Sequence, residues 1–277
     1  MKLQVLGREA YAYTGGKAFD ANLPCAVFIH GALNDHSVWA LQSRYLAHHG
    51  HGVLAVDLPG HGRSAGPALT SVGALADWLI ALLDAAGVQR AALVGHSMGS
   101  LIALEAASRL GERASRLVMV GTAYPMKVSA ALLDTARTAP LKAIDMVTSF
   151  SIATLAAKPS SPGPGSWLHG GARALMRKLQ ADYAREHGGA NLFHLDFSAC
   201  DAYTGGMEAA ARLHCPASMI LGEKDAMTMP RAAAELARAT HAHITYLSAG
   251  HTLMGEAPDG VLNALKDSLR PQAPQPS

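Results

Sequence analysis

The chain has 277 residues, of which 49% are hydrophobic and 16% charged, and its formal net charge at pH 7 is +2. The charged fraction is below the level of about a quarter that is typical of globular domains, which favours a large buried core. The nearly balanced charge, with no basic cluster, argues against nucleic acid or an anionic membrane as a partner.

Strands and helices alternate along most of the chain, which indicates βαβ units and a mostly parallel sheet. In chain order, eight strands are predicted near residues 2–6, 10–14, 25–30, 53–57, 91–96, 116–121, 217–222 and 243–247. Helices are predicted near residues 36–49, 71–86, 98–110, 230–239 and 257–269. The first two strands are expected to form an antiparallel edge. The pattern predicts an α/β fold with an eight-stranded sheet.

The long interval between the sixth and seventh predicted strands is expected to form a helical cap over the strand ends. Helical apolar spacing occurs at Leu132-Leu133, 141–147 and 174–179. A loop over 159–165, rich in proline and glycine, is expected to divide the cap and to act as a hinge; an ordinary surface connection is the alternative. The predicted division is 1–122 and 205–270 for the core, 123–204 for the cap and 271–277 for a disordered tail.

The three cysteines, Cys25, Cys200 and Cys215, show no C-x-x-C spacing, and their odd number favours a reducing compartment. The first residues have no sustained apolar core typical of a signal peptide. No run of about 18 apolar residues is present, so no membrane span is predicted. We expect a cytoplasmic protein that is a monomer or a homodimer.

Residues 95–99 read Gly95-His96-Ser97-Met98-Gly99 and lie between a predicted strand and a predicted helix. A G-x-S-x-G segment in a strand–turn–helix setting holds its serine on a strained turn above the sheet. Ser97 is therefore the predicted nucleophile. The pattern is short and the chain has 27 glycines, so chance is the alternative. Further motifs in a fixed order argue against chance.

A serine nucleophile needs a base, and the base needs an orienting acid. Asp225 follows the strand predicted near 217–222, and His251 follows the one near 243–247. The order Ser97, Asp225, His251 is that of α/β-hydrolases. Glu223 is the alternative acid, but Asp225 is preferred because it lies past the strand end. Cys200 is a second possible nucleophile and is interpreted as structural, because no motif positions a base for it.

A tetrahedral intermediate also needs backbone N–H donors for its oxyanion. Met98 N–H, directly after the nucleophile, is one predicted donor, and Ala32 N–H, in the loop after the strand near 25–30, is the other. Leu33 N–H is the nearby alternative to Ala32. His30 is interpreted as bracing this loop rather than as a catalytic base, since no partner acid is placed for it.

With these motifs the chain resembles α/β-hydrolase fold enzymes of the esterase, haloperoxidase and C–C hydrolase group. The residues that carry the resemblance are His30-Gly31-Ala32 with Trp39, Asp57 to Ser64, Gly95 to Gly99, Gly222 to Asp225, and Gly250-His251. The resemblance implies a three-layer α/β-hydrolase fold with an inserted helical cap. It also disfavours an epoxide hydrolase or a dehalogenase, because those relatives carry a nucleophilic aspartate where Ser97 stands.

The predicted function is a cofactor-free serine hydrolase that acts on a small or medium carboxylic ester or thioester. No metal is expected, because none of the 14 histidines shows H-x-x-x-H or H-E-x-x-H spacing. The candidate substrate contacts are Leu33, Met126, Met146 and Phe193. The same triad serves C–C bond hydrolysis, lactone opening, perhydrolysis and cyanohydrin cleavage, so these reactions stay open. A non-catalytic receptor for a small ligand is the alternative from another class.

Overall fold

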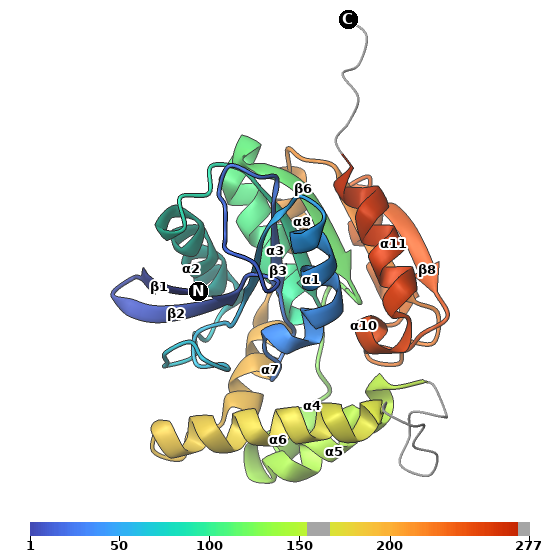
Figure 1. Ribbon diagram of the computed structural model, residues 1–277. Helices are drawn as coiled ribbons and strands as arrows, with labels where there is room; N and C mark the ends of the chain where they lie inside the picture. The colour runs from blue at the N-terminus through green and yellow to red at the C-terminus, as the bar shows by residue number, and fades with distance from the viewer. Residues whose placement is uncertain (154–166, 271–277) are drawn as a thin grey trace, which may run out of the picture.

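The computed structural model describes residues 1–153 and 167–270, which form a central sheet with helices on both faces and a further group of helices beside it (Figure 1). The strands of the sheet are β1 (Lys2–Val5), β2 (Arg8–Tyr13), β3 (Cys25–Ile29), β4 (Gly52–Val56), β5 (Ala91–His96), β6 (Ala114–Val120), β7 (Ala217–Gly222) and β8 (His243–Leu247). Their order in the sheet is β1-β2-β4-β3-β5-β6-β7-β8. The β1–β2 and β2–β4 pairs are antiparallel, and all others are parallel. The predicted eight-stranded, mostly parallel sheet and its antiparallel edge are confirmed. Over the same two ranges, none of the helices has the length and apolar character needed to span a membrane.

The strands lie close to their predicted positions. The central strands β3, β4 and β5 are buried along their whole length. Helices cover both faces of these strands, which explains why their sequences are continuous apolar runs rather than alternating ones.

Two apolar clusters separate the sheet from its covering helices. Val27 and Ile29 belong to the cluster that includes residues of the helices α2 (Val72–Ala85) and α3 (Met98–Leu110). Ala26 and Phe28 belong to the cluster that includes residues of α11 (Pro258–Leu269). The helices of this part of the chain are α1 (Ala40–His48), α2 (Val72–Ala85), α3 (Met98–Leu110), α8 (Gly206–Ala211), α9 (Ala234–Ala239), α10 (Leu253–Glu256) and α11 (Pro258–Leu269), with short 3-10 turns η1 (His36–Trp39), η2 (Gly111–Arg113) and η4 (Pro230–Ala233).

Four helices between β6 and α8 form a separate group, which we call the helical layer. They are α4 (Ala130–Thr138), α5 (Pro140–Ser151), α6 (Leu168–Glu186) and α7 (Leu192–Ala202). Figure 1 shows α4, α5 and α6 together below the sheet, with α7 leading back toward it. The layer has its own apolar cluster, and Asp145 on α5 pairs with Arg173 and Arg177 on α6. The hinge predicted at 159–165 and the tail predicted at 271–277 lie outside the described residues.

Candidate active site

Ser97 lies at the turn between β5 and α3, where its backbone has φ 52° and ψ −121°. A non-glycine residue rarely adopts this conformation, and it persists only where the surrounding structure enforces it. The flanking glycines explain how the turn is made. A Cβ on Gly95 would lie 2.0 Å from the Gly99 carbonyl oxygen, and one on Gly99 would lie 2.4 Å from the Ile29 carbonyl oxygen. Any side chain at these positions would force the strand and the helix apart.

Asp225 follows β7 and is buried, with 3% of its surface exposed. Its Oδ1 accepts hydrogen bonds from the backbone N–H groups of Met227 and Thr228, both at 2.8 Å. Its Oδ2 lies 2.8 Å from His251 Nδ1. Burial opposes ionisation of the carboxyl, but the nearby His251 and the bonds from Thr228 outweigh it and lower the pKa of Asp225. Glu223, the alternative acid, is exposed to solvent.

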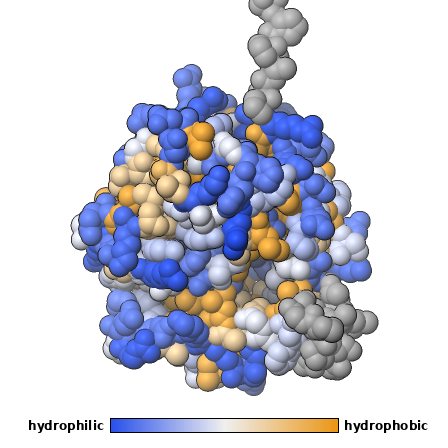
Figure 2. All heavy atoms as spheres, in the orientation of Figure 1, coloured by the Kyte–Doolittle hydropathy of each residue, from blue (hydrophilic) through white to orange (hydrophobic). Residues whose placement is uncertain are grey.

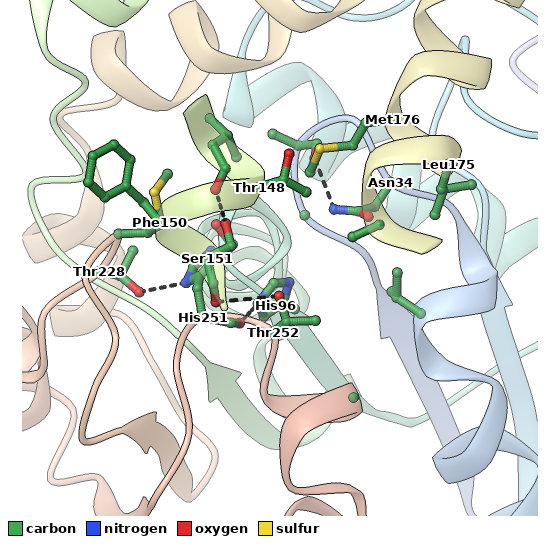
Figure 3. Close-up of a pocket in the computed structure, with 18 of the residues that line it drawn as sticks. Asn34, His96, Thr148, Phe150, Ser151, Leu175, Met176, Thr228, His251 and Thr252 are labelled. Carbon is green, nitrogen blue, oxygen red and sulfur yellow. Dashed lines mark hydrogen bonds between the residues drawn. The ribbon is translucent and has the colours of Figure 1, made fainter. Parts of the chain in front are cut away.

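His251 lies in the loop after β8, and hydrogen bonds hold both its ring and its backbone. The His251 N–H donates to the Ser151 carbonyl oxygen at the end of α5 (2.7 Å), and the His251 carbonyl oxygen accepts from His96 Nε2 (2.9 Å; Figure 3). Burial, together with the nearby His251, lowers the pKa of His96 to about 3. His96 therefore stays neutral and acts as a fixed hydrogen-bond donor to the loop.

Thr228 is a further member of this group that sequence reasoning missed. Its Oγ1 lies 3.1 Å from His251 Nδ1 (Figure 3), 2.8 Å from Asp225 Oδ2 and 2.9 Å from the Gly121 carbonyl oxygen. The hydroxyl therefore borders the contact between the carboxylate and the imidazole. A threonine three residues after the acid is a weak local signal, because only the fold brings it back against His251.

Ser97 and His251 both line one cavity of about 810 Å³ between the sheet and the helical layer. Among the described residues, no hydrogen bond joins the Ser97 hydroxyl to the His251 ring; such bonds are often long in free enzymes. Figure 2 shows apolar residues gathered where the helical layer meets the rest of the molecule. The large apolar side chains Leu41, Phe150 and Trp167 line the cavity and are at least half exposed.

The loop after β3, residues 31–34, approaches the serine closely. We call it the β3 loop. A Cβ on Gly31 would lie 3.1 Å from Ser97 Cβ, and the next residue, Ala32, lines the cavity. Within the described residues, the N–H groups of Ala32 and Met98 have no protein acceptor. Both predicted donors thus lie beside the serine with their amides unengaged.

Two further predictions concern this loop, namely Leu33 N–H as the alternative oxyanion donor and His30 as a bracing residue. Leu33 N–H donates to Asp196 Oδ2 at 2.7 Å, so this alternative donor is already engaged, and the Leu33 side chain is buried away from the cavity. His30 accepts from Leu58 N–H at Nε2 (3.1 Å) and lies 2.8 Å from the Gly31 carbonyl oxygen at Nδ1. These contacts agree with a bracing role for His30.

The predicted substrate contacts from residues 123–204 also differ in outcome. Met126 and Met146 line the cavity, whereas Phe193 does not. The Phe193 ring is fully buried and stacks on Phe197, with ring centroids 4.4 Å apart, and it is Phe197 that lines the cavity. Residues four apart share one helix face, so helical spacing alone does not tell which ring is nearer the cavity. Cys200 also lines the cavity, and burial raises the pKa of its thiol.

One group of side chains in the described residues has the ligand types and proximity of a metal site: Asp35, His36 and Asp57, whose ligand atoms lie within 4.8 Å of one another. The Asp57 oxygens already accept bonds from the His36 backbone and ring and from Arg63 N–H, at 2.7 to 2.9 Å. These bonds hold the turn after β4 in place. They account for the closeness of the three side chains, so no bound metal ion is needed to explain it.

A sequence model of the alpha/beta hydrolase family matches residues 26–264. The chain is similar to the dihydrolipoyllysine-residue acetyltransferase component of the acetoin cleaving system of Cupriavidus necator, at 35% identity over 41% of this chain and 29% of that protein. It is 38% identical to an epoxide hydrolase of Caballeronia sordidicola over 30% of this chain and 26% of that protein. The alignments thus span only about a quarter to a third of these relatives.

Solved structures match over nearly the whole chain. The enol-lactonase of Burkholderia xenovorans LB400 superimposes with a TM-score of 0.81 at 24% identity, covering 97% of this chain and 99% of that one. An esterase of Exiguobacterium antarcticum gives a TM-score of 0.79 at 16% identity, covering 97% and 98%. At such identities the likeness concerns the fold alone.

Proposed function

The chain belongs to the alpha/beta hydrolase family, and from that premise we propose that it is a serine hydrolase that cleaves a small or medium carboxylic ester or thioester through an acyl-enzyme. The observation that carries the proposal is the buried contact of 2.8 Å between His251 Nδ1 and Asp225 Oδ2, because His251 lines the same cavity as the strained Ser97. A base with an orienting acid beside an exposed hydroxyl is the arrangement that acyl transfer needs.

In the first half of the reaction the Ser97 hydroxyl attacks the substrate carbonyl carbon, and His251 Nε2 takes its proton. Asp225 keeps the Nδ1 proton in place and stabilises the imidazolium that forms. His251 then gives the proton to the leaving alcohol or thiol, and the acyl group stays on Ser97. In the second half, water attacks the acyl-enzyme with His251 again as base, and the carboxylic acid leaves.

The oxyanion of both tetrahedral intermediates is proposed to bind the N–H groups of Ala32 and Met98. Met98 begins α3, so the positive end of the helix dipole adds to its hydrogen bond. Preorganised donors in a site shielded from water are worth far more than the same donors in solution. None of these steps requires a cofactor.

We also propose that residues 123–204 form a cap that sets substrate preference, over a core of residues 1–122 and 205–270. Support comes from the cavity lining, to which α4, α5, α6 and α7 all contribute side chains. Most of these side chains are apolar, and Ser151, Thr228 and Thr252 lie around His251 in the same cavity (Figure 3). Such a cavity suits an apolar acyl or alcohol group.

The proposed function predicts steady hydrolysis of p-nitrophenyl acetate and butyrate by the purified protein. The measurement is the initial rate of nitrophenolate release, with a simple lactone and a vinylogous diketone as parallel substrates for ring opening and C–C cleavage. Turnover of the lactone or the diketone without turnover of either ester would replace ester hydrolysis by that reaction. Saturable ligand binding without turnover of any substrate would favour the receptor alternative.

The cap proposal predicts that Met146→Ala changes the preference between short and long acyl esters. Met146 lines the cavity, and hydrophobic contacts discriminate by about 1–3 kcal/mol for each methylene-sized group. The ratio of kcat/KM for octanoate to that for acetate should therefore shift about tenfold or more, with the acetate value nearly unchanged.

The matched control for Met146→Ala is Leu141→Ala on the same helix, because Leu141 is 50% exposed and does not line the cavity. Its acyl preference should equal that of the wild type. If neither Met146→Ala nor Phe197→Ala moves the ratio, the helical layer does not set acyl preference.

A further inference from the structure

A buried aspartate–histidine pair lies between the helical layer and the β3 loop, outside the proposed triad. Asp196 on α7 is 2% exposed, and its Oδ2 lies 2.9 Å from His61 Nε2 and 2.7 Å from Leu33 N. Neither Asp196 nor His61 lines the cavity. The contacts of the pair are with the backbone of the β3 loop rather than with any bound substrate.

The hydrogen bonds of this pair favour the protonated form of His61. His61 Nδ1 faces the Pro59 carbonyl oxygen at 3.1 Å, and Nε2 faces the Asp196 carboxylate, so both ring nitrogens face acceptors. Burial would lower the pKa of His61, but the charge and hydrogen bond of Asp196 outweigh it, and the pKa is raised. The imidazolium and the carboxylate therefore compensate each other, and no unpaired negative charge is left close to the β3 loop.

The two peptide groups that flank Ala32 are both held in place. His30 Nδ1 holds the Gly31 carbonyl oxygen at 2.8 Å, and because the C=O and N–H of a trans peptide point in opposite directions, Ala32 N–H points away from His30. In the next peptide, the Ala32 carbonyl oxygen accepts from Asn34 Nδ2 at 3.0 Å, and Leu33 N–H donates to the carboxylate on α7. One of the two hydrogen bonds that hold this second peptide therefore comes from the helical layer.

Leu33 needs that restraint because its backbone is strained, with φ 51°. Such a conformation persists only where the surroundings over-determine it. The fully buried Leu33 side chain packs in the apolar cluster of the helical layer, and Asp196 holds its amide. Both contacts come from residues far along the chain, so the shape of the β3 loop is set partly from α7.

We propose that Asp196 is a positioning residue for the oxyanion hole: through Leu33 N–H it holds the β3 loop so that Ala32 N–H faces the oxyanion formed on Ser97, while His61 balances its charge. The inference rests on the proposed function, because it gives Ala32 N–H the role of oxyanion donor. Asp196 itself touches neither substrate nor the reacting atoms.

The test is Asp196→Ala, measured with a p-nitrophenyl ester and with an alkyl trifluoromethyl ketone. Ser97 adds to the ketone carbon, its proton passes to His251, and the adduct carries an oxyanion. We expect kcat to fall about a hundredfold, since loss of one oxyanion donor costs about 10²–10³ in kcat. KM should change little, because the interaction is made only in the transition state. Affinity for the ketone should fall in parallel with kcat/KM.

Two variants separate positioning from a general effect on stability. Asp201→Ala removes another α7 carboxylate, which accepts from Val128 N–H at 3.0 Å but does not itself line the cavity and has no hydrogen bond to the β3 loop. It should lower the melting temperature but leave kcat and ketone affinity unchanged. Asp196→Asn keeps an acceptor for Leu33 N–H and should restore most of the kcat lost in Asp196→Ala.

Three results would overturn the proposal. They are an Asp196→Ala enzyme with lowered melting temperature but wild-type kcat and ketone affinity, a rise in KM with kcat unchanged, and an equal loss of kcat in Asp201→Ala. If Asp196→Ala does not fold, Asp196→Ser decides, because its shorter side chain does not reach Leu33 N–H; kcat and ketone affinity should then fall together, and wild-type values of both would overturn the proposal. Failure of the proposed function is recognised separately, as absence of ester turnover and of a ketone adduct in the wild-type protein.

Discussion

Ser97→Ala is expected to lower ester turnover at least about a thousandfold, because a nucleophile, its base and its acid act as a unit. The substitution removes only the hydroxyl, and alanine fits the space that serine occupies at the turn. The folded structure should therefore survive, and a thermal melt close to that of the wild type checks this. The measurement is kcat/KM for p-nitrophenyl butyrate.

A fluorophosphonate probe followed by peptide mass spectrometry gives an independent reading of the same site. It should label Ser97 and no other residue. Cys200→Ala is the matched control, since this thiol lines the same cavity but burial raises its pKa, so little thiolate forms. The control should keep wild-type turnover and labelling. Labelling at Cys200 or at another serine would assign the nucleophile elsewhere.

Asp225→Asn is expected to keep the fold and lower kcat by about 10³- to 10⁴-fold. An amide at this position presents an N–H to His251 Nδ1 and so stabilises the tautomer that lacks a free base at Nε2. The carboxylate is ionised across the neutral range, because its pKa is lowered by His251 and Thr228 against the effect of burial. Steady-state kinetics and circular dichroism together separate a tautomer effect from unfolding.

Glu223→Gln is the control for the acid, because Glu223 is two residues away, carries the same charge and is exposed. Its kcat should equal that of the wild type. A large loss in Glu223→Gln with a small loss in Asp225→Asn would transfer the orienting role to Glu223.

The sheet and the positions of Ser97, Asp225 and His251 follow from local signals in the sequence. The apolar run that forms β7 ends at Gly222, where the strand ends, and Asp225 lies three residues further along, in the loop. Parallel strands place their carboxyl ends at one edge, so residues that follow β5, β7 and β8 are expected to meet there. The physical reason is that burial on both faces leaves a continuous apolar run that is easy to read.

The contacts made by the helical layer could not be read in the same way. Asp196 and Leu33 are 163 positions apart, and nothing in the segment around either residue indicates the other. Phe193 and Phe197 have the same residue type on the same helix face, yet only Phe197 lines the cavity. Helical periodicity shows that a face is buried, but the depth of each residue depends on how the helix is tilted on its neighbours.

The hydrogen bond between α5 and the loop after β8 determines which sequence changes in α5 leave His251 undisturbed. His251 N–H is held by the main-chain carbonyl of Ser151, so the bond does not depend on which side chain stands at that position. Substitutions there can accumulate without disturbing the histidine. A one-residue deletion within α5 is different, since it would move the carbonyl by about 1.5 Å along the helix and turn it by about 100°. Lineages that vary this segment are therefore expected to tolerate substitutions at position 151 but to keep the length of α5.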